Sequence, residues 1–266
     1  MQKQASSYLL GIGLAGYAVL TFSLVIFLSS FFHTAPITSA LDDELSSTTL
    51  LPDFKSIKIT KTRKQEFLGL LRPLIDEKNQ KLLQSRERLL KLKAEFDQTG
   101  ELTGVNKRNL EVMRRKYNVS EETYPEIERT IAVLLLRVDE IPPAMVLAQA
   151  AAESGWGTSR FAEEAHNLFG QWCYTPGCGI VPARRSANAK HEIQKFNSVE
   201  ESITAYYRNI NTHSAYRNWR QMRANLRKEP EQFTGSNMVA ALGKYSERGD
   251  AYIAELRTLI RSNRLE

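Results

Sequence analysis

Residues 142–157 contain the stretch that most constrains the fold, a nearly uninterrupted apolar segment followed by a glycine-rich exit. Pro142 and Pro143 suit the start of a helix, because the first turn needs no backbone donor at those positions. Met145 to Ala152 is almost wholly apolar, and its small Ala residues let neighbouring helices approach closely. A helix with this composition is buried on most of its sides, so the stretch predicts a central core helix.

The only acid of this predicted helix is Glu153, which falls in the last turn before Gly155, a natural residue for a left-handed stop. A carboxyl at this position faces the negative end of the helix dipole and partly apolar walls, and both favour its protonated form. A glycosidase requires such a protonated carboxyl as its general acid. A solvated Glu at a frayed helix end is the commoner alternative in general. The Ala run and the Ser-Gly-Trp-Gly tail favour the catalytic interpretation here.

Three motifs together resemble one enzyme family: Ala-Gln-Ala-Ala-Ala-Glu-Ser-Gly-Trp-Gly at residues 148–157, Asn-Leu-Phe-Gly at residues 167–170, and the later Tyr245. They are similar to the glucosaminidase family of peptidoglycan hydrolases, glycoside hydrolase family 73, and within it to the Bax-like proteins. The resemblance covers roughly residues 125–263, with a weaker match upstream. It implies a mainly α, lysozyme-like helical domain with a small irregular or β lobe. The implied activity is that of an endo-β-N-acetylglucosaminidase acting on β-1,4 linkages of cell-wall glycan, with Glu153 as general acid and no cofactor.

Residues Tyr8 to Phe32 carry no charge and are long enough to cross a hydrocarbon core of roughly 30 Å. A cleavable signal has a shorter apolar core of roughly 7–15 residues, so the length favours an uncleaved inner-membrane anchor. The sequence Thr-Ser-Ala at residues 38–40 leaves cleavage and release open as an alternative. Lys3 before the run and acidic residues after it predict a cytoplasmic N-terminus and a periplasmic catalytic portion.

The expected organisation has four parts: an anchor over residues 1–40, a tether over 41–60, a helical extension over 61–120 packed on the catalytic domain, and a glucosaminidase-like catalytic domain over 121–266. The tether is rich in Ser, Thr and acids. In the extension, one of the two core positions of the heptad repeat is always apolar, whereas the other is apolar only in part. This pattern favours a helix that packs on its own domain over a free coiled coil. A partner-binding stalk is the functional alternative. Pro73 is expected to divide the extension into two helices.

The formal net charge of the chain is +6, a modest positive excess. It suits an anionic surface such as peptide-bearing glycan, so the expected partners are peptidoglycan strands and, through the N-terminal run, the inner membrane. Basic residues interleaved with aromatics, which would indicate nucleic-acid binding, do not form a patch in the sequence.

Several residues after Glu153 are candidate sugar contacts. Asn167 supplies both a donor and an acceptor, as a sugar acetamido group demands, and Phe169 offers a flat apolar face. Phe169 serves equally well as a core residue. The resemblance places Tyr245 near the scissile bond, whereas Tyr252 is expected to pack. The candidate substrate-binding residues are Trp156, Asn167, Phe169 and Trp172.

Cys173 and Cys178 flank a Pro-Gly turn. Two thiols of an exported chain that can close a small loop predict a disulfide, and the resemblance includes the same Cys-x4-Cys loop. A metal site would need more ligands nearby, so no metal is predicted.

Glu192 is the only acid in the region where many glucosaminidases place a second carboxylate. It is therefore a candidate catalytic base, with a solvated strand charge as the alternative. A substrate-assisted route through the 2-acetamido group of the sugar needs no second acid. Two further functions stay open: a lytic transglycosylase, and a non-catalytic murein-binding or scaffold protein.

Overall fold

The structure, a computed structural model, describes residues 48–183, 185 and 189–266, and this part of the chain is mainly α-helical, as predicted. The α-helices are α2 (Thr60–Thr99), α3 (Gly104–Lys116), α4 (Ile127–Arg137), α5 (Pro143–Ser154), α6 (Arg160–Ala165), α7 (Val199–Thr212), α8 (Arg217–Leu226), α9 (Gly235–Met238) and α10 (Asp250–Ser262). Short 3-10 helices occupy Ser214–Tyr216 (η2), Pro230–Gln232 (η3) and Val239–Ala241 (η4). The strands β1 (Trp172–Cys173), β2 (Gly179–Ile180) and β3 (Glu192–Gln194) form a small antiparallel sheet in the order β1-β3-β2.

Within these described ranges, no helix combines the length and the apolar character that crossing a membrane requires. The span predicted at Tyr8–Phe32 lies outside the described residues.

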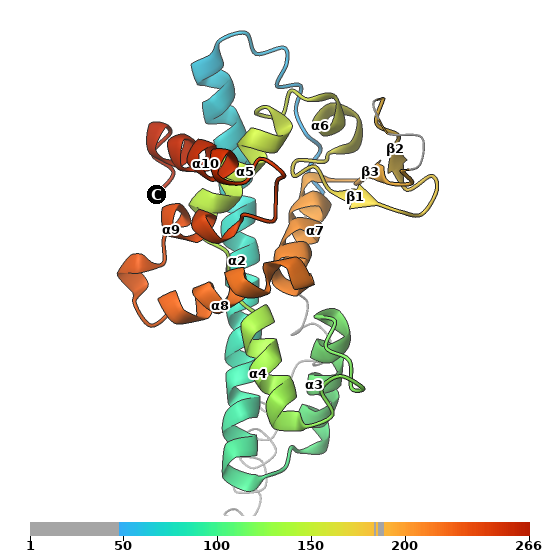
Figure 1. The fold of residues 1–266 in the computed structure, drawn as a ribbon, viewed down its shortest axis with the longest axis vertical. Coiled ribbons are helices and arrows are strands. Elements are labelled where there is room, and N and C mark those ends of the chain that lie inside the picture. The colour runs from blue at the N-terminus through green and yellow to red at the C-terminus, as the bar shows by residue number, and fades with distance from the viewer. Residues whose placement is uncertain (1–47, 184, 186–188) are drawn as a thin grey trace, which may run out of the picture. The chain divides into compact units, whose positions relative to one another are not determined.

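The helix α2 is continuous over 40 residues, so the predicted division at Pro73 was wrong. A proline inside a helix costs roughly 3 kcal/mol, because it removes a backbone donor and crowds the preceding turn. Pro73 itself is exposed, whereas Leu71, Leu74 and Ile75 beside it are buried. Burying one such side chain contributes about 1.5–3 kcal/mol, so packing around the proline outweighs its cost. The helix contacts α4, α5 and α7, and Figure 1 shows α3 and α4 beside its C-terminal half.

The helix α5 lies in the core, as its apolar composition predicts. Every residue from Ala144 to Ala151 is buried, and the helix contacts α2, α9 and α10 (Figure 1). Small residues allow this close packing: a β-carbon added to Gly235 of α9 would lie 2.7 Å from the backbone nitrogen of Met145. Helices therefore surround the element that carries Glu153, and they fix its position.

Residues 48–59, the N-terminal strap, lie on the helical domain, which corrects the described part of the tether expected over residues 41–60. The Phe54 side chain is only 1% exposed. The backbone N–H of Thr49 donates to a carboxylate oxygen of Glu200 at 2.8 Å, at the start of α7. The backbone N–H of Val199 donates in turn to the main-chain oxygen of Thr49 at 2.9 Å, so a buried aromatic ring and contacts with the start of α7 hold this segment.

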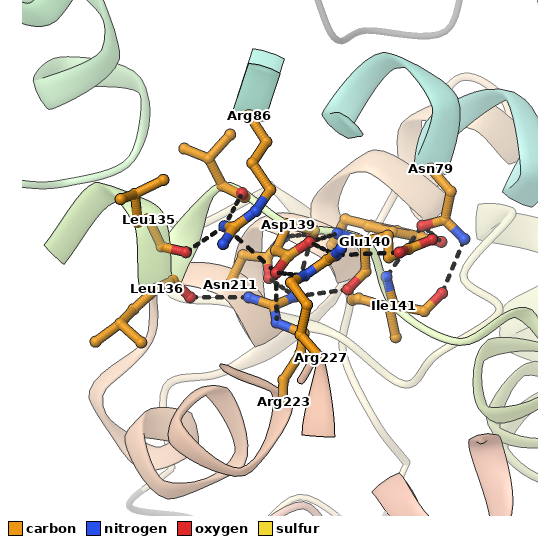
Figure 2. Close-up of polar contacts among 12 residues, drawn as sticks. Asn79, Arg86, Leu135, Leu136, Asp139, Glu140, Ile141, Asn211, Arg223 and Arg227 are labelled. Carbon is orange, nitrogen blue, oxygen red and sulfur yellow. Dashed lines mark hydrogen bonds and ion pairs between the residues drawn. The ribbon is translucent and has the colours of Figure 1, made fainter. Parts of the chain in front are cut away.

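A buried group of charged side chains joins several helices to the connection between α4 and α5 (Figure 2). Asp139 of that connection is 1% exposed, and its carboxylate pairs with Arg86 of α2 at 3.4 Å. It also accepts a 2.9 Å hydrogen bond from Arg227, just after α8. Arg223 of α8 lies 3.9 Å from the same carboxylate and donates to Asn211 of α7 at 2.8 Å. These five residues, the Asp139 cluster, satisfy the rule that buried charges are stable only when paired and hydrogen-bonded.

Candidate active site

The C-terminal end of α5 positions Glu153 in the way the sequence predicts. The helix stops at Gly155, whose φ of 57° lies in the left-handed region that glycine adopts without steric cost. The chain then turns through Trp156, which has a φ of 62°. A β-carbon added to Gly157 would approach the ring of Phe54 to 2.5 Å. The Ser-Gly-Trp-Gly exit thus closes the helix and seats it against the N-terminal strap.

The Glu153 carboxyl has a raised pKa, and burial is the main cause. Burial disfavours the charged form of a carboxyl, and the negative charge of Glu255 acts in the same direction. A hydrogen bond from the Tyr252 hydroxyl and the positive charge of Arg248 lower the pKa by less than burial raises it. Glu153 therefore keeps its proton to a higher pH than an ordinary carboxyl, which suits a proton donor.

The Asn-Leu-Phe-Gly loop, residues 167–170, lies beside this carboxyl. A β-carbon added to Gly170 would lie 3.5 Å from Oε2 of Glu153. The hydroxyl of Tyr245 donates to the main-chain oxygen of Phe169 at 2.9 Å. The structure therefore brings together Glu153, this loop and Tyr245, which are far apart in the sequence.

Asn167 and Phe169 are both buried at 2% exposure, where the sequence suggested direct sugar contacts. The Asn167 amide donates to the main-chain oxygens of Gln171 and Gln194, each at 2.9 Å. Its oxygen accepts from the N–H groups of Phe169 at 3.3 Å and Gln171 at 3.0 Å. These bonds use both donors and both acceptor sites of the amide. Phe169 stacks on Tyr206 with a centroid separation of 4.2 Å, so both residues shape the loop from within.

Glu192 is buried on β3 with 7% exposure, so the alternative of a solvated strand charge was wrong. Its two carboxylate oxygens accept the N–H groups of Gly177 at 3.1 Å and Gly179 at 2.9 Å. These two bonds lower the pKa of Glu192, since they favour its charged form. Because both oxygens are engaged, the arrangement favours a structural role over that of a catalytic base.

Cys173 and Cys178 form a disulfide with a Cα–Cα distance of 6.2 Å, which confirms the predicted pairing. Among the described residues, these two and Glu192 are the group whose potential metal-ligand atoms lie close together. Metal ligation by cysteine requires a free thiolate, which the disulfide removes. The turn between β1 and β2 is therefore held twice, by the disulfide and by the Glu192 carboxylate.

The two candidate tryptophans differ in accessibility. Trp172 is 53% exposed, and its ring stacks on His191 with a centroid separation of 3.9 Å. Trp156 is half-buried, meets Phe67 edge-on at 5.8 Å, and has the Lys64 amine 4.6 Å from its ring centre. Trp172 thus presents open aromatic surface to a ligand, whereas Trp156 belongs to the packing of the α5 exit.

Sequence reasoning missed three polar side chains next to Glu153. The Tyr206 hydroxyl donates to Oε1 of Gln149 at 2.6 Å, and Nε2 of Gln149 donates to the Tyr252 hydroxyl at 3.1 Å. Tyr252 packs as expected at 2% exposure, but its hydroxyl also lowers the pKa of Glu153. One signal was available in the sequence. Gln149 lies four positions before Glu153 in an apolar helix, and a buried amide requires partners.

Comparison with known protein families gives a match over the part of the chain that carries Glu153, the Asn-Leu-Phe-Gly loop and Tyr245. The glucosaminidase family, described as mannosyl-glycoprotein endo-beta-N-acetylglucosaminidase, matches residues 129–265. The chain therefore belongs to the glucosaminidase family, which indicates a peptidoglycan-related glycosidase.

Within that family the chain is Bax-like. It is 34% identical to protein bax of Escherichia coli (strain K12) over 215 residues, which cover 80% of this chain and 74% of that protein. No solved structure matches the chain.

Proposed function

We propose that this chain is an endo-β-N-acetylglucosaminidase that cleaves β-1,4 linkages of cell-wall glycan, with Glu153 as general acid. The observation that carries the proposal is the burial-raised pKa of Glu153 beside Gly170 of the Asn-Leu-Phe-Gly loop. Family membership supports the substrate class, and the helices packed around α5 fit the lysozyme-like domain that the sequence predicts. The predicted N-terminal anchor would hold the site at the periplasmic face of the inner membrane.

In the proposed reaction Glu153 gives its proton to the glycosidic oxygen while the bond from that oxygen to the anomeric carbon breaks. The second half of the chemistry is assigned to the substrate, because both oxygens of Glu192 are engaged. The carbonyl oxygen of the 2-acetamido group attacks the anomeric carbon and forms a cyclic intermediate. Water then opens this ring and returns one proton to Glu153, which restores the acid. Tyr245 holds the adjoining loop, and Trp172 offers an aromatic surface to the glycan.

The test is a digest of purified murein, with the products analysed by mass spectrometry and Glu153→Gln as the control protein. We expect fragments whose reducing ends are N-acetylglucosamine from the wild-type protein and almost none from the variant. Reducing ends on muramic acid, or equal products from both proteins, would contradict the proposal.

A lytic transglycosylase is the second candidate, and the same geometry supports it, since a single free carboxyl also suits that reaction. It predicts fragments with anhydro ends in the same digest. A non-catalytic murein-binding protein predicts binding with no released fragment, and a scaffold predicts that a cellular phenotype survives in Glu153→Gln.

The substrate-assisted route makes a prediction about two further side chains. Glu192→Gln is expected to change the cleavage rate by less than about tenfold, roughly 1.4 kcal/mol of barrier, because Gln keeps an oxygen that accepts one of the two N–H groups. Tyr245→Phe is expected to cost more, because it releases the Phe169 end of the loop beside Glu153. Initial rates on murein, at equal concentrations of folded protein, measure both effects. A folded but nearly inactive Glu192→Gln protein would show that Glu192 is the base.

A further inference from the structure

A chain of hydrogen bonds runs through the core toward Glu153 and links α7, α5 and α10. Tyr206 donates to Gln149 at 2.6 Å, and Gln149 donates to Tyr252 at 3.1 Å, so the proton of the buried Tyr252 hydroxyl needs another acceptor. Glu153 lies one helical turn beyond Gln149, and the Tyr252 hydroxyl lowers its pKa. Resting on the proposed function, we infer that Tyr252 is a positioning residue for the Glu153 acid, and that Tyr206 and Gln149 fix the direction in which Tyr252 donates.

The two distances support the direction of the chain. Hydrogen bonds from hydroxyl to oxygen are typically shorter than those from amide nitrogen to oxygen, at about 2.7–2.8 Å against about 2.9–3.0 Å. The short contact to Tyr206 and the longer one to Tyr252 fit an amide whose oxygen faces Tyr206 and whose nitrogen faces Tyr252. With the amide turned over, Tyr252 would donate to Gln149 and have no proton left for Glu153, since a hydroxyl carries only one.

Because these side chains are buried, each can form hydrogen bonds only with its protein partners. Gln149 and Tyr206 are 0% exposed and Tyr252 is 2% exposed, so bulk water cannot replace a lost partner. Gln149 and Glu153 lie four residues apart on α5, a spacing that puts them on the same side of the helix. The three packed helices therefore hold the Tyr252 hydroxyl and the Glu153 carboxyl in fixed relation, as a positioned acid requires.

The other groups that face Glu153 come from four places: α7, η2, the loop before α10, and α10 itself. The charged ones are Arg248, before α10, and Glu255, on α10. Three tyrosines also lie near Glu153: Tyr206 of α7, Tyr216 of η2 and Tyr245 of the loop before α10. Burial is the main cause of their raised pKa values, and the charge of Glu153 raises them further. Against this background the Tyr252 bond favours the ionised carboxylate and opposes the effect of burial. It thus lets Glu153 release its proton as well as hold it.

The experiment follows the Glu153 carboxyl directly, by carbon-13 NMR titration of the full chain, together with the pH dependence of kcat/KM on murein. Tyr252→Phe removes the donor and is expected to raise the Glu153 pKa by about one pH unit, since a hydrogen bond to a charged group is worth about that much. The alkaline limb of kcat/KM should move up with it while kcat falls. Tyr206→Phe frees the amide of Gln149 and should produce a smaller shift in the same direction.

Tyr207→Phe is the matched control. Tyr207 is the neighbour of Tyr206 on α7, is 1% exposed, and donates to Asn79 at 2.9 Å, outside the chain that ends on Glu153. It should lower stability like the other variants but leave the Glu153 pKa unchanged. An unchanged pKa in Tyr252→Phe, or equal shifts in Tyr252→Phe and Tyr207→Phe, would overturn the inference. A wild-type protein that cleaves no murein would contradict the proposed function alone, because the NMR titration still reports on Tyr252.

Discussion

Glu153→Gln is expected to lower the rate of glycan cleavage by about 10²–10⁴, the usual contribution of a general acid. Glutamine has nearly the same shape and can still accept the Tyr252 hydrogen bond, but it has no proton to give to the leaving oxygen. Single-turnover or initial rates on murein measure the loss. The control is Glu164→Gln, an exposed carboxyl of α6 that pairs with Arg160 at 3.1 Å, which should keep the wild-type rate. A Glu153→Gln protein with more than about a tenth of wild-type activity would rule out this role.

The raised pKa of Glu153 predicts that the same variant, although less active, is more stable than the wild type at high pH. In the unfolded chain this carboxyl ionises at its ordinary pKa, whereas in the folded protein it ionises only at a higher pH. Between these two values the folded state binds more protons, so the free energy of unfolding falls as pH rises through this window. Below this pH window Glu153→Gln should therefore have the same melting temperature as the wild type. Above the window its melting temperature should be higher than that of the wild type. A lower melting temperature at alkaline pH would contradict the burial argument.

Asp139→Ala is expected to lower the free energy of unfolding by about 3–5 kcal/mol, the usual cost of removing one partner from a buried ion pair. The buried guanidinium group of Arg223 and the partly exposed ones of Arg86 and Arg227 would lose their shared negative charge. Burial lowers the pKa of Arg223 only to about 10, so this side chain stays charged at neutral pH and cannot escape the cost by losing its proton. Urea unfolding followed by circular dichroism measures the change, with the slope of the transition checked for two-state behaviour.

Glu140→Ala provides the comparison for this prediction. The Glu140 side chain is 24% exposed and pairs with Arg227 at 3.0 Å, so its loss should cost about 1 kcal/mol or less. If Asp139→Ala does not fold, Asp139→Asn removes the charge but keeps one acceptor oxygen, and it should lie between the wild type and Ala. Asp139 variants within about 1 kcal/mol of the wild type would show that the cluster contributes little.

Local patterns were enough to predict α5 and its exit, because prolines, an apolar run and a glycine act through the backbone of their own segment. The disulfide between Cys173 and Cys178 could be predicted for a similar reason, since a short turn brings its two ends together. Pro73 shows the opposite case, in which burial of neighbours such as Leu71 by distant helices decides whether a local break occurs.

The polar parts of the candidate site could not be predicted in the same way. The sequence pattern predicts that a tyrosine on the apolar face of a helix, such as Tyr252, is a core residue. This prediction is the same whether or not its hydroxyl has a function, since the ring is buried in both cases. Asn167 and Glu192 have the residue types of ligand contacts, and only the positions of nearby backbone groups show that their polar atoms are already engaged. Residue type predicts what a side chain can bind, whereas the tertiary structure decides what remains free to bind.

The course of α2 determines where a recombinant fragment of this protein can begin. The family match starts at residue 129, inside α4, and a fragment cut there would lack Arg86 and uncover the faces of α4 and α5 that α2 covers. Such a fragment would carry apolar patches that promote aggregation during expression. Phe54, buried against the exit of α5, moves the usable start further upstream. A fragment that begins upstream of Thr49 keeps Phe54 and the hydrogen bond from Thr49 to Glu200, and so preserves the surroundings of the Glu153 helix for crystallisation and titration.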